Sequence, residues 1–264
     1  MPIIYKKLVS TEDFIQCVEL QRDLFGLSDV DIVSPLIMQL IAREDPSMGI
    51  ILGAYSIEEE KEKLVGFILT MATFQEKSIY GAIIGVKPNF RNQGLGINLF
   101  LKFREIAIRK NIDIFYGVFE PLEMKLARLY FNRLGFHGIR YQHDPSNERG
   151  KTEKGFVPSD KILLKWDLKN FSPQNENRND FSGLLNSCPI ATVNSMPDSP
   201  MVLVEIPGDF VRLLNEDVAA ATYWRQNTKE IFSHYINQQK YVICDCLSAE
   251  ENQIKKSYYL LKAQ

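Results

Sequence analysis

The chain has 264 residues, of which 45% are hydrophobic and 24% charged, and its formal net charge is −2. This composition is typical of a globular protein with one large domain or two smaller ones. The near-balanced charge argues against a nucleic-acid-binding surface, and no apolar run approaches the length of a membrane span. The start of the chain lacks the charge order of a signal peptide, so we expect a cytoplasmic protein.

The four cysteines agree with a reducing compartment, because they are widely scattered and a chain of this size needs no disulfides to hold its core. Cys244 and Cys246 lie two apart in a predicted strand and are therefore expected to share a face. No second Cys or His pair follows at metal-ligand spacing. We therefore interpret the two cysteines as structural and expect no metal site.

The first part of the chain predicts a short strand, two helices and a hairpin. Ser10 or Thr11 is expected to cap a helix whose first turn carries Glu12 and Asp13, where negative charge suits the helix dipole. The expected order is a strand at 5–9, this first helix up to Gly26, a second helix at 34–43, strands at 49–55 and 64–71 joined by a charged turn, and a strand at 79–86.

The next part alternates between helices and strands. Apolar residues at helical spacing predict a helix from Leu95 to about Lys110, and β-branched and aromatic residues predict a buried strand at 112–119. Pro121 is expected to open another helix, because its missing N–H costs nothing there, and Gly135 is expected to end it. A later stretch of alternating residues predicts a half-buried strand at 160–168.

The composition changes after residue 168. Residues 169–200 are rich in Asn, Ser, Pro and Asp, which predicts a linker with little regular structure. Residues 201–264 predict a small α/β extension, with a strand at 201–206, a helix from 218 to about 235 that Asn215 caps, and a hairpin of strands at 241–246 and 257–261. We therefore expect a core at 1–168, a linker at 169–200, and an extension at 201–264 that packs on the core.

The segment 84–96 carries the clearest chemistry. A strand ends before Pro88, and the pattern Arg91-x-x-Gly94-x-Gly96 opens the next helix. Glycine lets a ligand approach the backbone, and the free N–H groups at a helix N-terminus favour an anion, to which Arg91 can add a charge-assisted contact. The spacing fits neither the dinucleotide fingerprint nor the P-loop. An ordinary glycine-rich turn is the alternative.

Two motifs in this order resemble the GNAT superfamily of acyl-CoA-dependent N-acyltransferases. The segment 84–96 is similar to its motif A, a strand ending in Val-x-Pro and then Arg-x-x-Gly-x-Gly at the start of a helix. Residues 127–136 resemble motif B, the helix and Gly-Phe turn beside the pantetheine arm. The resemblance covers residues 2–168. It implies an α/β GNAT fold, a mixed, splayed central sheet flanked by helices, here with a small C-terminal α/β extension.

The resemblance also implies acyl-CoA as the co-substrate and a set of residues that hold it. In this family the strand that ends at Val86 splays from the next strand, and the gap admits the pantetheine arm. The main chain of Ile84 and Val86 is then expected to hold pantetheine. The N–H groups expected to hold the pyrophosphate are those of Arg91, Asn92, Gln93, Gly94, Leu95 and Gly96. The implied reaction is direct attack of a primary amine on the thioester, without a covalent enzyme intermediate.

A narrower resemblance covers nearly the whole chain. The stretches that carry it are Phe119-Glu120-Pro121-Leu122, Pro158-Ser159-Asp160-Lys161, Trp166, Val204-Glu205-Ile206-Pro207 and Trp224-Arg225. They look like a GNAT subfamily with a C-terminal extension, some members of which are linked to N-succinylation of amino acids, while related enzymes fatty-acylate peptide amines. The match leaves open a succinyl, acetyl or medium-chain fatty acyl group, an amino acid or a peptide side-chain amine as acceptor, and an acyl carrier protein in place of CoA.

The catalytic groups are less clear, because the strand at 79–86 holds no acidic residue where some family members place one. Glu120, just after the neighbouring strand, is our candidate for the general base. Its alternatives are binding of the substrate ammonium and capping of the next helix. Many family members carry a tyrosine as the acid at the position of Phe131. Tyr130 is one step, about 100°, around the helix, so we weigh it as the acid against a packing role.

Two further features have plainer interpretations. His137 follows the second motif and is expected to be a surface strand residue rather than a reacting group, and the polar segment 141–154 is expected to be a solvated loop rather than a lid. The missing tyrosine and strand carboxylate motivate a competing class, a non-catalytic acyl-CoA-binding module whose extension binds a partner. A homodimer formed through the extension is compatible with either class.

Overall fold

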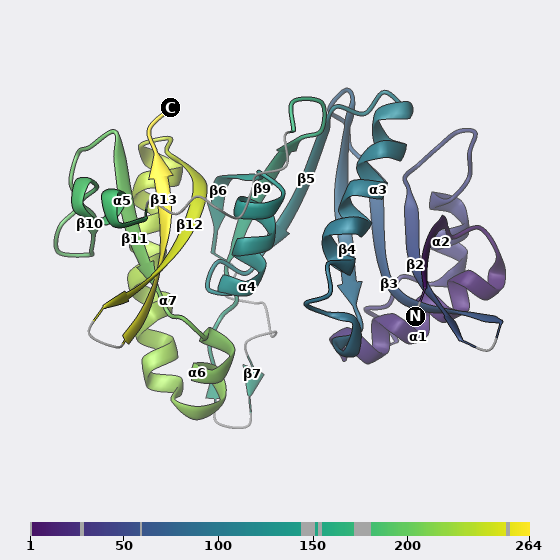
Figure 1. Ribbon diagram of the computed structural model, residues 1–264, viewed down its shortest axis with the longest axis horizontal. Helices are drawn as coiled ribbons and strands as arrows, with labels where there is room; N and C mark the ends of the chain where they lie inside the picture. The colour runs from purple at the N-terminus through teal and green to yellow at the C-terminus, as the bar shows by residue number, and fades with distance from the viewer. Residues whose placement is uncertain are drawn as a thin grey trace. The chain divides into compact units, whose positions relative to one another are not determined.

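The computed structural model describes residues 2–26, 29–58, 60–143, 151–152, 155–171, 181–251 and 254–264. Most of the polar segment 141–154, and residues 172–180 of the expected linker, lie outside the described residues. The chain divides into two compact units. The first unit holds Met1–Gly117 and Asp167–Asn170, and the second holds Val118–Trp166 and Phe171–Gln264. Figure 1 shows the described helices and strands, with labels on many of them.

The first unit is built on a mixed sheet. Its strands are β1 (Ile3–Lys7), β2 (Ile51–Glu58), β3 (Lys61–Ala72), β4 (Ser78–Val86) and the first part of β5 (Ile114–Phe119), neighbours in this order. The pairs from β1 to β4 are antiparallel, and β4 pairs with β5 in parallel. The helices are α1 (Thr11–Phe25), α2 (Pro35–Ile41) and α3 (Leu95–Arg109), with a short 3₁₀ turn η1 (Pro88–Phe90) before α3. The predicted order of these elements is confirmed.

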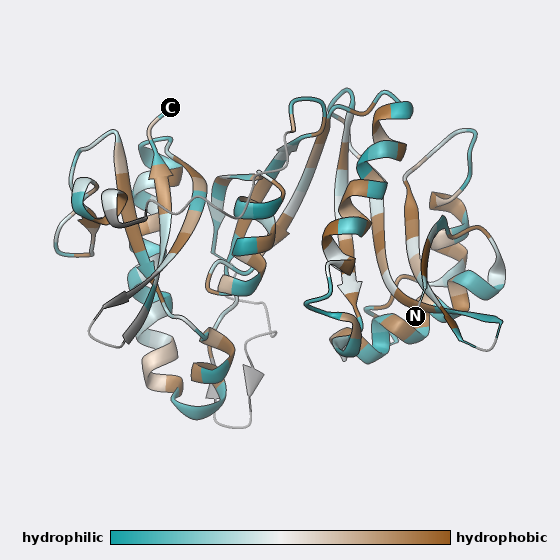
Figure 2. Ribbon diagram, in the orientation of Figure 1, coloured by the Kyte–Doolittle hydropathy of each residue, from teal (hydrophilic) through white to brown (hydrophobic). Residues whose placement is uncertain are grey.

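Alternation along β3 explains why helices cover both faces of this sheet, since successive strand residues point to opposite sides. Phe67 belongs to a buried core that α1 and α2 complete with Phe14 and Met38. On the other face, a Cβ built on Gly66 would lie 3.0 Å from the side chain of Leu95, so α3 packs closely there. Figure 2 shows β3 largely brown and α3 banded in brown and teal, as expected for a buried strand under an amphipathic helix.

The start of α1 confirms the capping prediction and identifies the cap as Ser10. The Ser10 hydroxyl accepts from the Asp13 N–H at 3.1 Å, and the Asp13 carboxylate accepts from the Ser10 N–H at 3.0 Å. The other carboxylate oxygen of Asp13 accepts a 2.7 Å hydrogen bond from the hydroxyl of Tyr55. Burial alone would raise the pKa of Asp13, but the hydrogen bonds from Tyr55, Ser10 and Val9 outweigh it and lower the pKa to about 2.

This carboxylate makes the stability of the first unit depend on pH. The pKa of Asp13 is lower in the folded than in the unfolded chain, so its contribution is complete above about pH 4 and is lost as the pH falls toward 2. Asp13→Asn is expected to lower the free energy of unfolding at pH 7 by about 2 kcal/mol. Urea unfolding at pH 7 and pH 3 measures the difference, which should shrink at the lower pH; an equal difference at both would contradict the assignment.

The second unit contains a sheet of its own. Its strands are β9 (Lys161–Asp167), β6 (His137–Gln142), β12 (Val242–Glu251), β13 (Ile254–Lys262), β11 (Met201–Ile206) and β10 (Ile190–Ala191), neighbours in this order. β10 and β11 are parallel and the other pairs are antiparallel. The strands of the predicted extension therefore continue the sheet of β6 and β9.

Four helices and two π-helical segments accompany this sheet in the described part of the second unit. They are α4 (Met124–Ala127), α5 (Phe181–Ser187), α6 (Phe210–Glu216) and α7 (Val218–Phe232), with the π-helical segments η2 (Arg128–Arg133) after α4 and η4 (Ser233–Gln238) after α7. A small separate hairpin joins β7 (Lys151–Thr152) to β8 (Gly155–Phe156).

Three local predictions differ from the structure of the second unit. Residues 169–200, predicted to have little regular structure, contain α5 and β10. The cap of α7 is Asp217, whose side chain accepts from the Ala220 N–H at 3.0 Å, and not Asn215, because Asn215 is still inside α6. The helix expected to open at Pro121 begins only with α4.

A β-bulge separates Cys244 from Cys246. The register of β12 against β13 shifts between Ile243 and Asp245. Cys244 packs beside the apolar cluster of α5 and strands β11 to β13, whereas Cys246 Sγ donates to Asn132 Oδ1 at 2.8 Å. The prediction that the two cysteines share a face is therefore wrong, because the extra residue breaks the alternation of the strand.

Candidate functional site

Strand β4 parts from β5 after three residue pairs. The parallel register joins Ser78, Ile79 and Tyr80 to β5 and ends there, although β4 continues to Val86. The register of β4 against β3 skips Ala82, and such a bulge bends a strand and increases its twist. The second half of β4 therefore presents an edge that no described residue of β5 pairs with.

The free edge of β4 is formed by Ile84 and Val86. The N–H of Lys87 donates to the carbonyl of Val65 at 2.8 Å, so Lys87 faces β3. In an antiparallel ladder successive residues alternate, and Val86 and Ile84 therefore turn their main-chain groups away from β3. The Val86 carbonyl accessible on that side accepts from Arg91 Nε at 2.9 Å. The N–H of Val86 and both main-chain groups of Ile84 point to the side where pantetheine is expected.

The turn after β4 exposes unpaired N–H groups. Asn92 and Gly94 have φ values of 59° and 78°, the left-handed conformations that bring the chain into α3. The N–H of Asn98 donates to the Gly94 carbonyl at 3.0 Å as the first bond of the helix. Among the described residues, the N–H groups of residues 95–97 have no acceptor, as expected at a helix N-terminus. The N–H of Arg91, which was predicted to hold the pyrophosphate, donates instead to the Pro88 carbonyl at 3.1 Å, so the unpaired groups at the positive end of α3 come later in the turn.

A hollow of about 590 Å³ lies beside this turn. Its lining residues are Ile3, Tyr5, Glu58, Asn89, Phe90, Gln93, Leu95 and Asn98. None of these described residues is a cation. An anion bound at the turn would therefore be neutralised by the main chain and by Arg91, whose side chain is exposed.

Glu120 lies in the second unit, directly after β5, and its carboxylate is already engaged. Oε1 accepts from Arg225 Nη1 at 2.7 Å and from the Leu122 N–H at 3.1 Å, and Oε2 accepts from Ser159 Oγ at 2.9 Å. The side chain is 13% exposed. A carboxylate offers about four acceptor positions, so one position on Oε2 remains among the described contacts. The bond to Leu122 shows that Glu120 also holds the turn before α4.

A second carboxylate completes this charge cluster. Asp160 is fully buried, and its Oδ2 lies 3.6 Å from Arg225 Nη1. The same oxygen accepts from the Tyr141 hydroxyl, and His143 Nδ1 lies 2.7 Å from Oδ1. Burial and the hydrogen bond to Asp160 raise the pKa of Tyr141, so its hydroxyl stays a donor. Arg225 is thus placed between the fully buried carboxylate of Asp160 and the largely buried carboxylate of Glu120.

The cluster gathers residues that the site prediction did not select. Ser159, Asp160 and Arg225 were noted only as parts of the stretches that carry the narrower resemblance, and no role was predicted for them. Each contacts Glu120 directly or through Arg225. Their sequence signal was a polar residue in an otherwise buried stretch, as with Arg225 on the buried face of α7.

Tyr130 lies in η2 and packs among aromatic rings. Its ring meets Phe119 and Phe136 edge-on, with centroids 5.4 Å and 5.3 Å away. The residue is 7% exposed. Burial, with a smaller effect of Glu123, raises the pKa of its hydroxyl. These contacts support the packing alternative, and the role of Tyr130 as an acid stays a prediction. The π-helical register of η2 also alters the angle expected between Tyr130 and Phe131.

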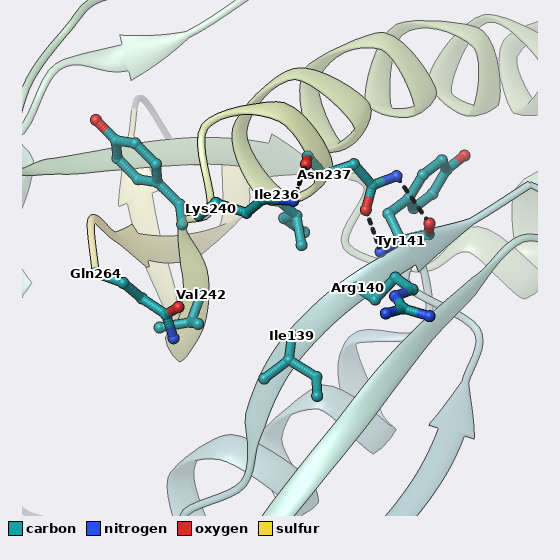
Figure 3. A pocket seen from close by; sticks show the side chains of 9 residues that line it. Ile139, Arg140, Tyr141, Ile236, Asn237, Lys240, Val242 and Gln264 are labelled. Carbon is teal, nitrogen blue, oxygen red and sulfur yellow. Dashed lines mark hydrogen bonds between the residues drawn. The ribbon is translucent and has the colours of Figure 1, made fainter.

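The cavity in Figure 3 is a separate feature of the second unit. It has a volume of about 350 Å³ and lies between β6, η4 and the start of β12. The main chain of Tyr141 exchanges two hydrogen bonds with the Asn237 side chain, at 3.1 Å and 2.9 Å, as the dashed lines in Figure 3 show. No predicted site residue lines this cavity.

His137 is exposed on β6 opposite Lys165, as expected of a surface strand residue.

The fold is that of the GNAT acyltransferases: a mixed sheet flanked by helices, in which β4 parts from β5 before a glycine-rich turn. Two solved structures share it at a TM-score of 0.50. The ribosomal-protein-S18-alanine N-acetyltransferase from Escherichia coli is 16% identical, and the match covers 67% of this chain and 98% of that one. The N-acetyltransferase from Staphylococcus aureus Mu50 is 13% identical, with 64% and 100% covered. At these identities the likeness is one of fold alone.

Residues 16–136 match the model of the family described as the Acetyltransferase (GNAT) family. The matched region includes both the turn at 91–96 and Glu120. No curated protein matches the chain. The helices of the described residues are too short or too polar for any of them to cross a membrane. The described residues also contain no group of His, Cys, Asp and Glu suited to a metal ion.

Proposed function

We propose that the protein is an N-acyltransferase that moves an acyl group from acyl-CoA to a primary amine of an amino acid or a peptide side chain. The observation that carries the proposal is the turn at 91–96, where unpaired N–H groups open α3 directly after the free edge of β4. The family match of residues 16–136 supports the same donor.

In this proposal the turn at 91–96 binds the pyrophosphate of CoA, because a helix N-terminus offers both free N–H groups and a positive dipole end. The main chain of Ile84 and Val86 pairs with the amides of the pantetheine arm, as an added strand would. Arg91 uses Nε to hold the Val86 carbonyl, and its two terminal nitrogens are left to contact a phosphate oxygen.

The acceptor amine is assigned to Glu120 Oε2, the oxygen with an unused acceptor position. A neutral primary amine donates a proton to Oε2 as its nitrogen attacks the thioester carbon. The C–N bond forms, the C–S bond breaks, and CoA leaves as a thiolate that takes a proton from solvent or from Tyr130. Holding the amine and the thioester in a reactive geometry supplies much of the rate. Acetyl, succinyl and medium-chain fatty acyl donors all fit this scheme.

The test is amine-dependent release of free thiol. The purified protein is expected to release CoA from acetyl-, succinyl- or octanoyl-CoA when the right amine is present, together with an equimolar amide product. A panel of amino acids and lysine-containing peptides, followed by mass spectrometry, identifies the acceptor. Binding of acyl-CoA with no amine-dependent thiol release from any member of the panel would exclude the enzymatic function.

A non-catalytic acyl-CoA-binding module is the second candidate. It is favoured by the contacts of the two proposed catalytic groups, since Glu120 is paired with Arg225 and Tyr130 is packed between aromatic rings. Mass analysis of the ligand that the purified protein retains separates the two. A stable acyl-CoA that persists in the presence of amines favours the binding module, and free CoA with an acylated amine favours the enzyme.

A further inference from the structure

The helix α7 carries a cation on its buried face. Ala221, Arg225 and Thr228 recur at spacings of four and three, and all three are buried. Arg225 is 4% exposed, although arginine is almost never fully buried unless it is paired. Its guanidinium lies over the ring of Phe210, with its central carbon 4.8 Å from the ring centroid. An apolar residue would suit this position better if packing were its only purpose.

The charges around Arg225 form one connected set. Glu120 Oε1 accepts its hydrogen bond, and Asp160 Oδ2 lies 3.6 Å from the same nitrogen. The other nearby cation, Lys161, donates to the Ser159 hydroxyl, which in turn donates to Glu120 Oε2. Arg225 is therefore the cation that contacts Glu120 directly within the described part of the second unit.

We propose that Arg225 is a positioning residue for the transfer reaction, fixing the carboxylate of Glu120 through Oε1 so that Oε2 faces the acceptor amine. The inference rests on the proposed role of Glu120. Two donors, Arg225 and the Leu122 N–H, hold Oε1, and the Ser159 hydroxyl sets the remaining direction on Oε2. A side chain from the C-terminal segment thus controls a group that directly follows β5.

A positioning role and a purely structural role for Arg225 differ in which kinetic constants change when Arg225 is removed. Removing Arg225 leaves Oε1 with the Leu122 N–H as its one described donor, so the Glu120 carboxylate is held less firmly about its terminal bond, which is broad and roughly two-fold. The acceptor amine then meets Oε2 in the reactive orientation less often. The loss of Arg225 should therefore change kcat and the KM for the amine. Affinity for acyl-CoA should not change, because the donor is assigned to the main chain of residues 84–96.

The experiment is a double-mutant cycle of Arg225→Met and Glu120→Gln in the full-length protein. If Arg225 acts through Glu120, the single variants each lower kcat/KM for the amine by about 100-fold, and the double variant is no worse than Glu120→Gln within about threefold. The matched control is Arg212→Met, which removes an exposed arginine of α6 paired with Glu216 and should leave kcat/KM unchanged. Effects of the two substitutions that multiply in the double variant would overturn the positioning role.

Arg225→Lys covers the case in which Arg225→Met does not fold. It keeps the charge but loses the planar fork, so an intermediate kcat/KM at unchanged acyl-CoA affinity is expected. A crystal structure provides a readout independent of turnover: the Glu120 carboxylate should leave its 2.9 Å contact with Ser159 Oγ in the Arg225 variant. If the wild-type protein binds acyl-CoA but acylates nothing, the proposed function fails, and the contact then reports only whether Arg225 orients the Glu120 carboxylate. A carboxylate that keeps the wild-type contacts would reject it.

Discussion

Glu120→Gln is expected to lower kcat for amine acylation by about 100-fold and to leave the affinity for acyl-CoA unchanged. The amide of glutamine has the shape of the carboxylate, and its oxygen can still accept from Arg225 and Leu122. It cannot accept a proton from the attacking amine. The measurement is steady-state thiol release over a range of amine concentrations, together with calorimetric titration of CoA.

The kinetic pattern separates the alternatives for Glu120. A rise in KM for the amine at unchanged kcat would assign the carboxylate to ammonium binding alone, and an unchanged kcat/KM would leave it only its contacts with Arg225, Leu122 and Ser159. The control is Glu123→Gln, which changes the next acidic residue of the same turn. The base assignment requires that this control retain the wild-type kcat.

Gly94→Val is expected to weaken CoA binding by about tenfold or more. Gly94 has a φ of 78°, and a left-handed conformation costs a β-branched residue roughly 1–2 kcal/mol. The turn can relieve this strain only by rotating the peptides that carry the N–H groups at the start of α3. Space is not the cause, because the nearest atom to an added Cβ is Asn98 Nδ2 at 4.0 Å. Calorimetric titration with CoA measures the change.

The chain offers a matched control for this substitution. Gly26 ends α1 with a φ of 58°, and a Cβ there would meet nothing within 4 Å. Gly26→Val therefore imposes the same kind of backbone strain outside the turn. It should lower the unfolding midpoint and spare the affinity for CoA. Equal losses of affinity in the two variants would mean that the effect is a general consequence of strain and that the turn does not bind the pyrophosphate.

The elements of the first unit could be predicted because their patterns are local. Ser10 with Asp13 is a capping pair within one turn, and the apolar run of β3 involves only neighbouring residues. The turn at 91–96 could be placed for the same reason, since Gly94 and the start of α3 adjoin it in the chain. Short-range spacing is enough to predict where such N–H groups are left unpaired.

The charge cluster could not be predicted in this way. Glu120 and Arg225 are 105 positions apart, and no periodic pattern connects them. Arg225 did carry a weak signal, because it falls between Ala221 and Thr228 on the apolar stripe of α7, where a cation needs a partner. The sequence does not say which carboxylate that partner is. Contacts between strands and a distant helix depend on the whole fold of the second unit.

The exact repeat of a helix or strand was the second property that could not be predicted from the sequence. The π-helical turn η2 and the bulge beside Cys244 each add one residue to a regular repeat. Both changes are small in energy and leave the composition of the segment unaltered, so periodicity alone does not reveal them. The consequence was larger for the site, because the orientation of Tyr130 depends on the repeat of η2.

The contact between Arg91 Nε and the Val86 carbonyl ties the exposed turn back to the end of the strand before it. Because this hydrogen bond already restricts the turn, ligand binding should cost it little further conformational entropy. Less of the intrinsic affinity is then spent on ordering the protein, and the bound and free forms of the turn should be nearly alike. Under the proposed function, the pyrophosphate of CoA therefore meets a turn that already has its bound shape, and adjustment on binding falls to the ligand.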